Sequence, residues 1–143
     1  MLLHWVSAAV ILWTLVTGFY VANVNVSNDT KQWVAGVNVS LTTLFIPVFC
    51  WRLVVFVSHL RHERMAQFSS AKMLAMFVHR LIYLLVAVVL VSGVLMMDRP
   101  IPVFGLFEFP QPLSDVALTD GFFVLHIWAC TALAVLVAMH IGA

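Results

Sequence analysis

Four runs of apolar residues, each long enough to cross a lipid bilayer as a helix, constrain this chain more than any other feature. They cover about residues 2–22, 37–57, 74–97 and 121–142, and a hydrocarbon core about 30 Å thick needs about 20 residues of helix. Hydrophobic residues make up 64% of the chain and charged residues only 9%, which is too little polar surface for a water-soluble domain of this size. The sequence therefore predicts an all-α fold, a four-helix transmembrane bundle in which residues 1–143 form a single domain.

The charged residues between these runs predict the orientation of the bundle. Residues 61–72 carry three Lys or Arg and one acid, whereas residues 98–120 carry four acids and one Arg. Because Lys and Arg concentrate on the cytoplasmic side, we expect residues 61–72 and both termini to be cytoplasmic. The last run stops three residues after His140 without a basic or polar tail, so we expect short cytoplasmic ends beyond these residues. A net charge of +1 gives no case for nucleic-acid binding.

Four histidines fall inside the apolar runs: His4, His79, His126 and His140. An ionisable residue inside a bilayer is costly and usually faces the bundle interior, so each of them is a functional candidate. His126 and His140 are fourteen residues apart, close to four helical turns, so both lie on one face and about 21 Å apart along the axis. The predicted topology puts His4, His79 and His140 in the inner half of the bundle and His126 in the outer half.

Two interpretations of these histidines are open. Neutral imidazole is a usual axial ligand of haem, and two imidazoles on facing helices hold a b-type haem without covalent attachment. Alternatively, each histidine is a polar residue that hydrogen-bonds between helices. The equal depth of His4 and His140 and the spacing of His126 and His140 favour haem ligation. Neither Cys50 nor Cys130 belongs to a C-x-x-C-H motif, which excludes covalent c-type haem.

Arg52 lies near the predicted inner interface. Snorkelling of its charged end toward water is the ordinary explanation, and pairing with haem propionates is the functional alternative. His59 and His62 fall in the basic connection and are expected to contact solvent or lipid headgroups. No carboxylate lies deep in an apolar run, which disfavours a proton-driven transporter with an acidic relay.

Several short motifs follow one another along the four runs. They are His4-Trp5; Asn38-Val39-Ser40 followed by Arg52; His79-Arg80-Leu81-Ile82-Tyr83-Leu84-Leu85 and Gly93-Val94-Leu95-Met96-Met97; Pro102-Val103-Phe104-Gly105-Leu106; and the pair His126 and His140. In this order and spacing the chain resembles the bacterial cytochrome b561 family, including its superoxide:quinone oxidoreductase members. It also resembles the related cytochrome b subunits of membrane formate dehydrogenases and hydrogenases. The resemblance covers essentially the whole chain and implies that the protein lies in a bacterial inner membrane.

The resemblance implies an inner haem b held by His4 and His140. It also implies an outer haem held by His126 and a histidine of the second run, but Asn38 stands at that histidine's position. Because a carboxamide is a poor ligand for haem iron, we predict one fully ligated haem. If the outer haem is present, His126 should hold it alone; if it is absent, Asn38 and His126 should hydrogen-bond to each other or to water. His79 corresponds to a quinone-side residue or a substitute ligand.

The function that the resemblance implies is that of a membrane b-type cytochrome, an oxidoreductase that transfers electrons between a quinone and a second redox partner. In superoxide:quinone oxidoreductase members, that partner would be superoxide at the outer face. We expect the quinone in the inner half, where His79, Arg80 and Arg52 share one height. Two alternatives remain open: a haem-bearing anchor subunit for a dehydrogenase, and a non-catalytic membrane scaffold that has lost haem.

Overall fold

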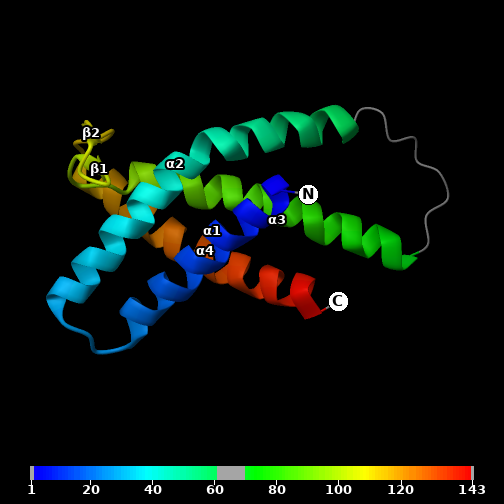
Figure 1. The fold of residues 1–143 in the computed structure, drawn as a ribbon, viewed down its shortest axis with the longest axis horizontal. Coiled ribbons are helices and arrows are strands. Elements are labelled where there is room, and N and C mark those ends of the chain that lie inside the picture. The colour runs from blue at the N-terminus through cyan, green and yellow to red at the C-terminus, as the bar shows by residue number, and fades with distance from the viewer. Residues whose placement is uncertain (1, 61–69, 143) are drawn as a thin grey trace.

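The computed structural model describes residues 2–60 and 70–142, and the side chains of residues 2–59 and 72–142. These residues form four long helices and one β-hairpin (Figure 1). The helices are α1 (Leu2–Asn23), α2 (Asn28–Leu60), α3 (Ser70–Leu95) and α4 (Val116–Gly142), and the strands are β1 (Ile101–Val103) and β2 (Phe107–Phe109). All four helices are long and apolar enough to span a membrane, which confirms the predicted all-α bundle. The cytoplasmic location of the termini stays a prediction.

The helices pack as two pairs. α1 packs on α2, α3 packs on α4, and the two pairs meet mainly where α2 contacts α3. A shared apolar core lies between the pairs and consists of Leu15, Phe45, Phe49, Val86, Leu90 and Leu133. Leu133 is only 2% exposed and lies seven residues from both His126 and His140. The core therefore separates two levels of histidines along α4.

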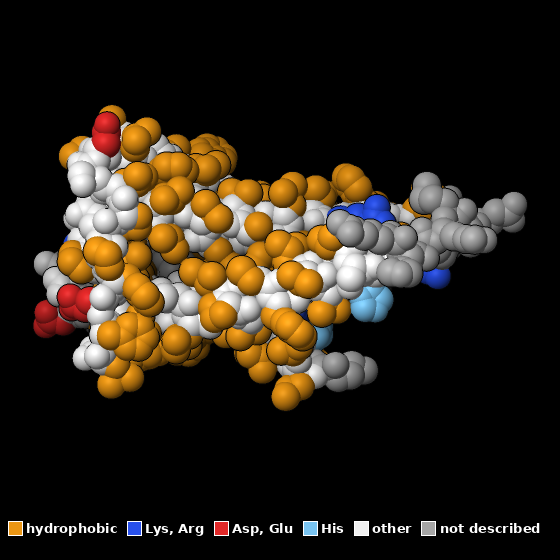
Figure 2. Space-filling view, turned by 90° about the horizontal axis from the view of Figure 1, so that it is seen from above, with side chains coloured by type: hydrophobic (Ala, Val, Ile, Leu, Met, Phe, Trp, Pro, Cys, Tyr) orange, Lys and Arg blue, Asp and Glu red, His pale blue; other side chains and the backbone are white. Residues whose placement is uncertain are grey.

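The surface agrees with a bilayer environment. Large apolar side chains are exposed along the helices, and Figure 2 shows them covering the length of the molecule. In that view, acidic side chains lie at the end that carries the hairpin, and the basic and histidine side chains gather toward the opposite end. The charge asymmetry predicted from the sequence is therefore also an asymmetry between the two ends of the bundle.

α2 extends past its apolar run at both ends. The predicted span was residues 37–57, whereas the helix runs from Asn28 to Leu60. Ser27 caps its start, because the Ser27 hydroxyl lies 3.2 Å from the Thr30 amide nitrogen and accepts its hydrogen bond. Pro47 lies within the helix, and α2 changes direction along its course in Figure 1. A proline removes one backbone donor and pushes against the preceding turn, which explains a bend.

The connection between α3 and α4 contains a hairpin that the sequence did not predict. β1 pairs antiparallel with β2, with Val103 opposite Phe107. Phe104 and Gly105 form the turn with positive φ angles of 49° and 71°, which glycine adopts freely and phenylalanine rarely does. Ser40 of α2 holds this turn: its hydroxyl accepts from the Phe104 amide at 3.0 Å and donates to the Pro102 carbonyl at 3.2 Å. These two hydrogen bonds hold the hairpin on α2, and Val103 of β1 is only 1% exposed.

Candidate functional site

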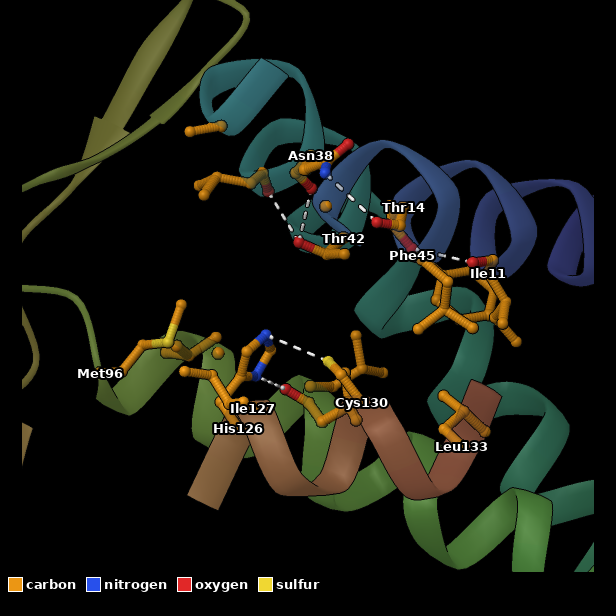
Figure 3. A pocket seen from close by; sticks show the side chains of 18 of the residues that line it. Ile11, Thr14, Asn38, Thr42, Phe45, Met96, His126, Ile127, Cys130 and Leu133 are labelled. Carbon is orange, nitrogen blue, oxygen red and sulfur yellow. Dashed lines mark hydrogen bonds between the residues drawn. The ribbon is translucent and has the colours of Figure 1, made fainter. Parts of the chain in front are cut away.

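A cavity of about 560 Å³ lies between the two helix pairs, in the half of the bundle nearer the hairpin. Its walls come from all four helices and from Ile101 of β1, and its volume is typical of small-molecule and cofactor sites. Most of the lining is apolar. The polar side chains in its walls include Thr14, Asn38, Thr42, Thr43, His126 and Cys130. Figure 3 shows Asn38 and Thr42 on one side of this cavity and His126 and Cys130 on the other.

His126 is held in one orientation by α3. Its Nδ1 atom lies 3.1 Å from the Val89 carbonyl oxygen and 3.1 Å from the Ser92 hydroxyl. A carbonyl oxygen only accepts, so the proton of the neutral ring belongs on Nδ1 and Nε2 carries the lone pair. Nε2 lies on the cavity side of the ring, 3.5 Å from Cys130 Sγ (Figure 3). Histidines that ligate metals commonly donate their other N–H to a carbonyl in this way.

Gly93 makes room for the His126 ring. A Cβ atom at this position would lie 3.1 Å from His126 Cε1 and 3.4 Å from Nδ1. Ordinary contacts between carbon atoms are about 3.5–4.0 Å, so any other residue would press on the ring. The glycine therefore allows α4 to bring its imidazole close to the backbone of α3.

Asn38 faces the cavity from the opposite pair of helices. Its Oδ1 accepts from the Thr17 hydroxyl at 3.0 Å, and its Nδ2 donates to the Thr14 carbonyl at 3.4 Å. The hydrogen bonds of Asn38 thus go to α1, and those of His126 go to α3 and to Cys130. Between these two described side chains, the structure does not show the direct hydrogen bond that we considered for a cavity without haem.

Only one wall of the cavity offers a usual axial ligand for haem. His126 offers an imidazole with its lone pair toward the open space, whereas the Asn38 carboxamide is not among the usual axial ligands. Within residues 2–60 and 70–142, no group of three or more His, Cys, Asp or Glu side chains is placed to hold a bare metal ion. Haem brings its own equatorial ligands, so it is the metal group that a single histidine can hold.

The other three histidines of the apolar runs, His4, His79 and His140, lie at the opposite level of the bundle. The rings of His79 on α3 and His140 on α4 have centroids 6.0 Å apart, with their planes at 44°. His79 also interacts electrostatically with His4 and Arg52. The ring of His4 contacts Trp5, at 5.9 Å between centroids. The structure thus brings the three inner histidines to one level; the His4–His140 axial pair stays a prediction, and His79 is the nearer neighbour of His140.

Arg52 connects three helices at this level. Its guanidinium donates to the Leu3 carbonyl of α1 and to the Tyr83 hydroxyl of α3, each at 3.1 Å. It also lies 5.5 Å from the centre of the Tyr83 ring, which stacks on Phe56 at 4.3 Å. Arg52 is therefore half-buried and held between α1 and α3 near His79, and its pairing with haem propionates stays a prediction. A guanidinium has five N–H donors, so these two bonds leave donors for an anionic group.

A second cavity of about 360 Å³ opens beside the inner histidines. Its lining combines basic, histidine and apolar side chains: Phe56, His59, Lys72, Ala75, Met76, His79, Arg80 and His140. His59, which we expected to contact solvent or lipid headgroups, is exposed and borders this cavity. His62 lies outside the described residues. The cavity coincides with the region in which the sequence led us to expect a quinone.

Sequence reasoning missed the residues that orient His126 and Arg52. Ser92 is fully buried and bonds His126 across 34 positions of sequence, and Tyr83 bonds Arg52 across 31 positions. Gly93 and Tyr83 both stand in motifs quoted above, which was the available signal for them. Ser92 gave no signal, because a serine inside a helix usually bonds only its own backbone.

The comparison with protein families agrees with this arrangement. The family described as "Prokaryotic cytochrome b561" matches residues 1–143, the whole chain. No curated protein and no solved structure gives a significant match. Four membrane-spanning helices with histidines at two levels between them fit such a family. The chain therefore belongs to the prokaryotic cytochrome b561 family, whose members are membrane b-type cytochromes that act in electron transfer.

Proposed function

We propose that this protein transfers electrons between a quinone and a second redox partner through haem b held between its two helix pairs. One observation carries the proposal: histidines from three helices, α1, α3 and α4, lie at one level of the bundle, with the ring centroids of His79 and His140 6.0 Å apart. Ionisable side chains within membrane spans are functional candidates. When bound, haem supplies the one-electron redox chemistry. The chain supplies axial imidazoles, apolar surroundings and positioned donors.

His4 and His140 are proposed as the axial pair of an inner, low-spin haem. His4 lies near the start of α1 and His140 near the end of α4, both at the level of His79, and the resemblance to the family gives them this role. Arg52 is fixed beside them through Leu3 and Tyr83. Its remaining N–H groups would bond a haem propionate, because charge-assisted hydrogen bonds to carboxylates are strong.

The second cavity is proposed as the quinone site. A quinone needs an apolar wall for its ring and a hydrogen-bond donor for a carbonyl; Phe56 supplies the first and His79 the second. A neutral imidazole both donates a hydrogen bond and relays a proton near neutral pH. His79 can serve either the quinone or the iron, so its substitution separates the two roles.

The second redox partner is proposed to be neutral or cationic. Residues 24–36 and 98–120, which include the charged residues near the hairpin end, carry five acids and two basic residues. Acidic residues at an entrance lower the local concentration of anions. Superoxide is an anion, so the charge of this end disfavours it as the second partner.

The experiment is reduction of the purified protein by quinol, with single histidine variants. We expect sharp α bands on reduction, loss of the low-spin inner haem in His4→Ala and His140→Ala, and slower quinol reduction with the haem retained in His79→Ala. His62→Ala, in the basic connection, is the matched control. An unaltered low-spin spectrum in His140→Ala would refute the ligand assignment. Absence of haem bands in the unmodified protein would instead support a scaffold, and copurification of a dehydrogenase would support an anchor subunit.

A further inference from the structure

We infer that the larger cavity is a binding site for a small neutral diatomic molecule, which reaches haem iron from the side of Asn38 while His126 holds the iron from the other side. The inference rests on the proposed function, because it needs haem b in the cavity. It goes beyond that function in assigning an open coordination position to one haem. The open coordination position follows from Asn38, which stands where the family resemblance implies a histidine.

The first step is the fixed direction of His126. The two bonds of Nδ1 to Val89 and Ser92 leave Nε2 as the ligating atom on the cavity side. Gly93 keeps the ring close to α3. This wall of the cavity is therefore built to offer one imidazole.

The second step is that the opposite wall offers a donor in place of a ligand. The Asn38 amide is drawn toward α1 by Thr17 and Thr14. An amide nitrogen carries two N–H groups, and the bond to Thr14 uses one of them. The other can donate to a polar molecule in the cavity. Hydrogen-bond donors and steric access on the open side decide whether a haem binds small ligands or only carries electrons.

The third step is that the neighbouring polar and sulfur groups do not fill this position. The hydroxyls of Thr42 and Thr43 donate to backbone carbonyls of their own helix, at 2.8 Å from the oxygens of Asn38 and Val39. Cys130 belongs to the same helix as His126, one turn along. Met96 lies on the His126 side of the cavity in Figure 3. On the wall opposite His126, Asn38 is therefore the side chain whose amide keeps an N–H group beyond the bonds described above, while the nearer Thr42 hydroxyl is used by its own helix.

The chemical class of the ligand follows from the surroundings. The lining is mostly apolar, and burying a charge in such a space is costly without a partner. The acids near the hairpin end also disfavour anions. A neutral diatomic molecule such as dioxygen, nitric oxide or carbon monoxide meets both conditions.

Carbon monoxide is the probe that tests this inference. We expect the reduced, purified protein to contain two haems. One is low-spin and does not bind carbon monoxide; the other is high-spin, and its Soret band shifts when carbon monoxide is added. His126→Ala should lose only the second component, whereas the control His62→Ala should keep both. Asn38→His should turn the second haem low-spin and lower its carbon monoxide response at least tenfold. Asn38→Leu should keep that haem and its response to carbon monoxide, which accepts hydrogen bonds poorly, but should weaken the affinity of the reduced haem for dioxygen about fivefold, through loss of one hydrogen bond.

The possible results separate this inference from the proposed function. A single low-spin haem that ignores carbon monoxide would overturn the inference and leave the proposed function intact. Two low-spin haems, both silent to carbon monoxide, would also overturn it, and would make Met96 or Met97 a ligand. Equal dioxygen affinity in Asn38→Leu and the unmodified protein would refute the role of Asn38 as donor. A protein without any haem would refute the proposed function itself.

Discussion

Replacing Gly93 by alanine tests how firmly the bundle positions His126. The added Cβ would lie 3.1 Å from His126 Cε1, several tenths of an ångström inside the usual distance of about 3.5–4.0 Å. The ring must therefore move away from α3. That movement lengthens the two 3.1 Å bonds of Nδ1 to Val89 and Ser92, which are already near the long end of useful hydrogen bonds.

The expected magnitude follows from these contacts. Losing one neutral hydrogen bond costs about 1 kcal/mol, which corresponds to about a fivefold loss of haem affinity at His126. The backbone works in the opposite direction, because alanine is favoured over glycine inside a helix by about 0.5–1 kcal/mol. The thermal stability of Gly93→Ala should therefore change little, while the haem that we propose at His126 should be lost more readily.

Gly36→Ala is the matched control for this experiment. Gly36 also lies within a helix, α2, and a Cβ there meets no atom within 4 Å. The variant therefore gains the helix-stabilising effect of alanine without a steric clash. The assay is the haem-to-protein ratio after purification, together with the rate of haem transfer to a haem-free acceptor protein. If both variants retain haem equally well, then His126 is not held in the way that the structure indicates.

Three further predictions concern the hairpin, Arg52 and the second redox partner. Ser40→Ala removes the acceptor of the Phe104 amide and should destabilise the hairpin by about 1–3 kcal/mol, seen as faster proteolysis within residues 101–109; equal rates in Ser40→Ala and the control Thr131→Ala would contradict this. Arg52→Lys should lower the melting temperature, because a lysine lacks the planar fork that spans two acceptors. The double variant Arg52→Lys, Tyr83→Phe should lose less stability than the sum of the losses in the two single variants, and additive losses would refute the interaction between Arg52 and Tyr83. Electron transfer to a neutral partner should change less than about twofold with added salt, whereas superoxide would react faster as salt screens the acids.

The helices were predictable because each is a long, continuous apolar run. Their ends were less predictable, since hydropathy reports how deep a residue lies in the membrane and not whether its backbone is helical. Residues 28–32 are polar and still helical, because Ser27 caps the turn. The hairpin escaped prediction because its strands have only three residues each and its order depends on Ser40, 64 positions from Phe104.

The site was predictable in depth but not in pairing. Fourteen residues of continuous helix put His126 and His140 on two levels, and α4 is continuous from Val116 to Gly142. Which ring meets His140 depends on how the helices are rotated, and no spacing within one helix fixes that. This is why the proximity of His79 to His140 appeared only in three dimensions.

The division of the helices into two pairs has a consequence for how the protein is assembled. Each pair is a helical hairpin that can enter the bilayer and satisfy its own backbone hydrogen bonds. The walls of the larger cavity belong to both hairpins, so the site for a prosthetic group exists only after the hairpins have met. A group that binds the joined form and not the separate hairpins stabilises that form by mass action. We therefore expect the supply of prosthetic group to control how much of the inserted chain matures and escapes degradation.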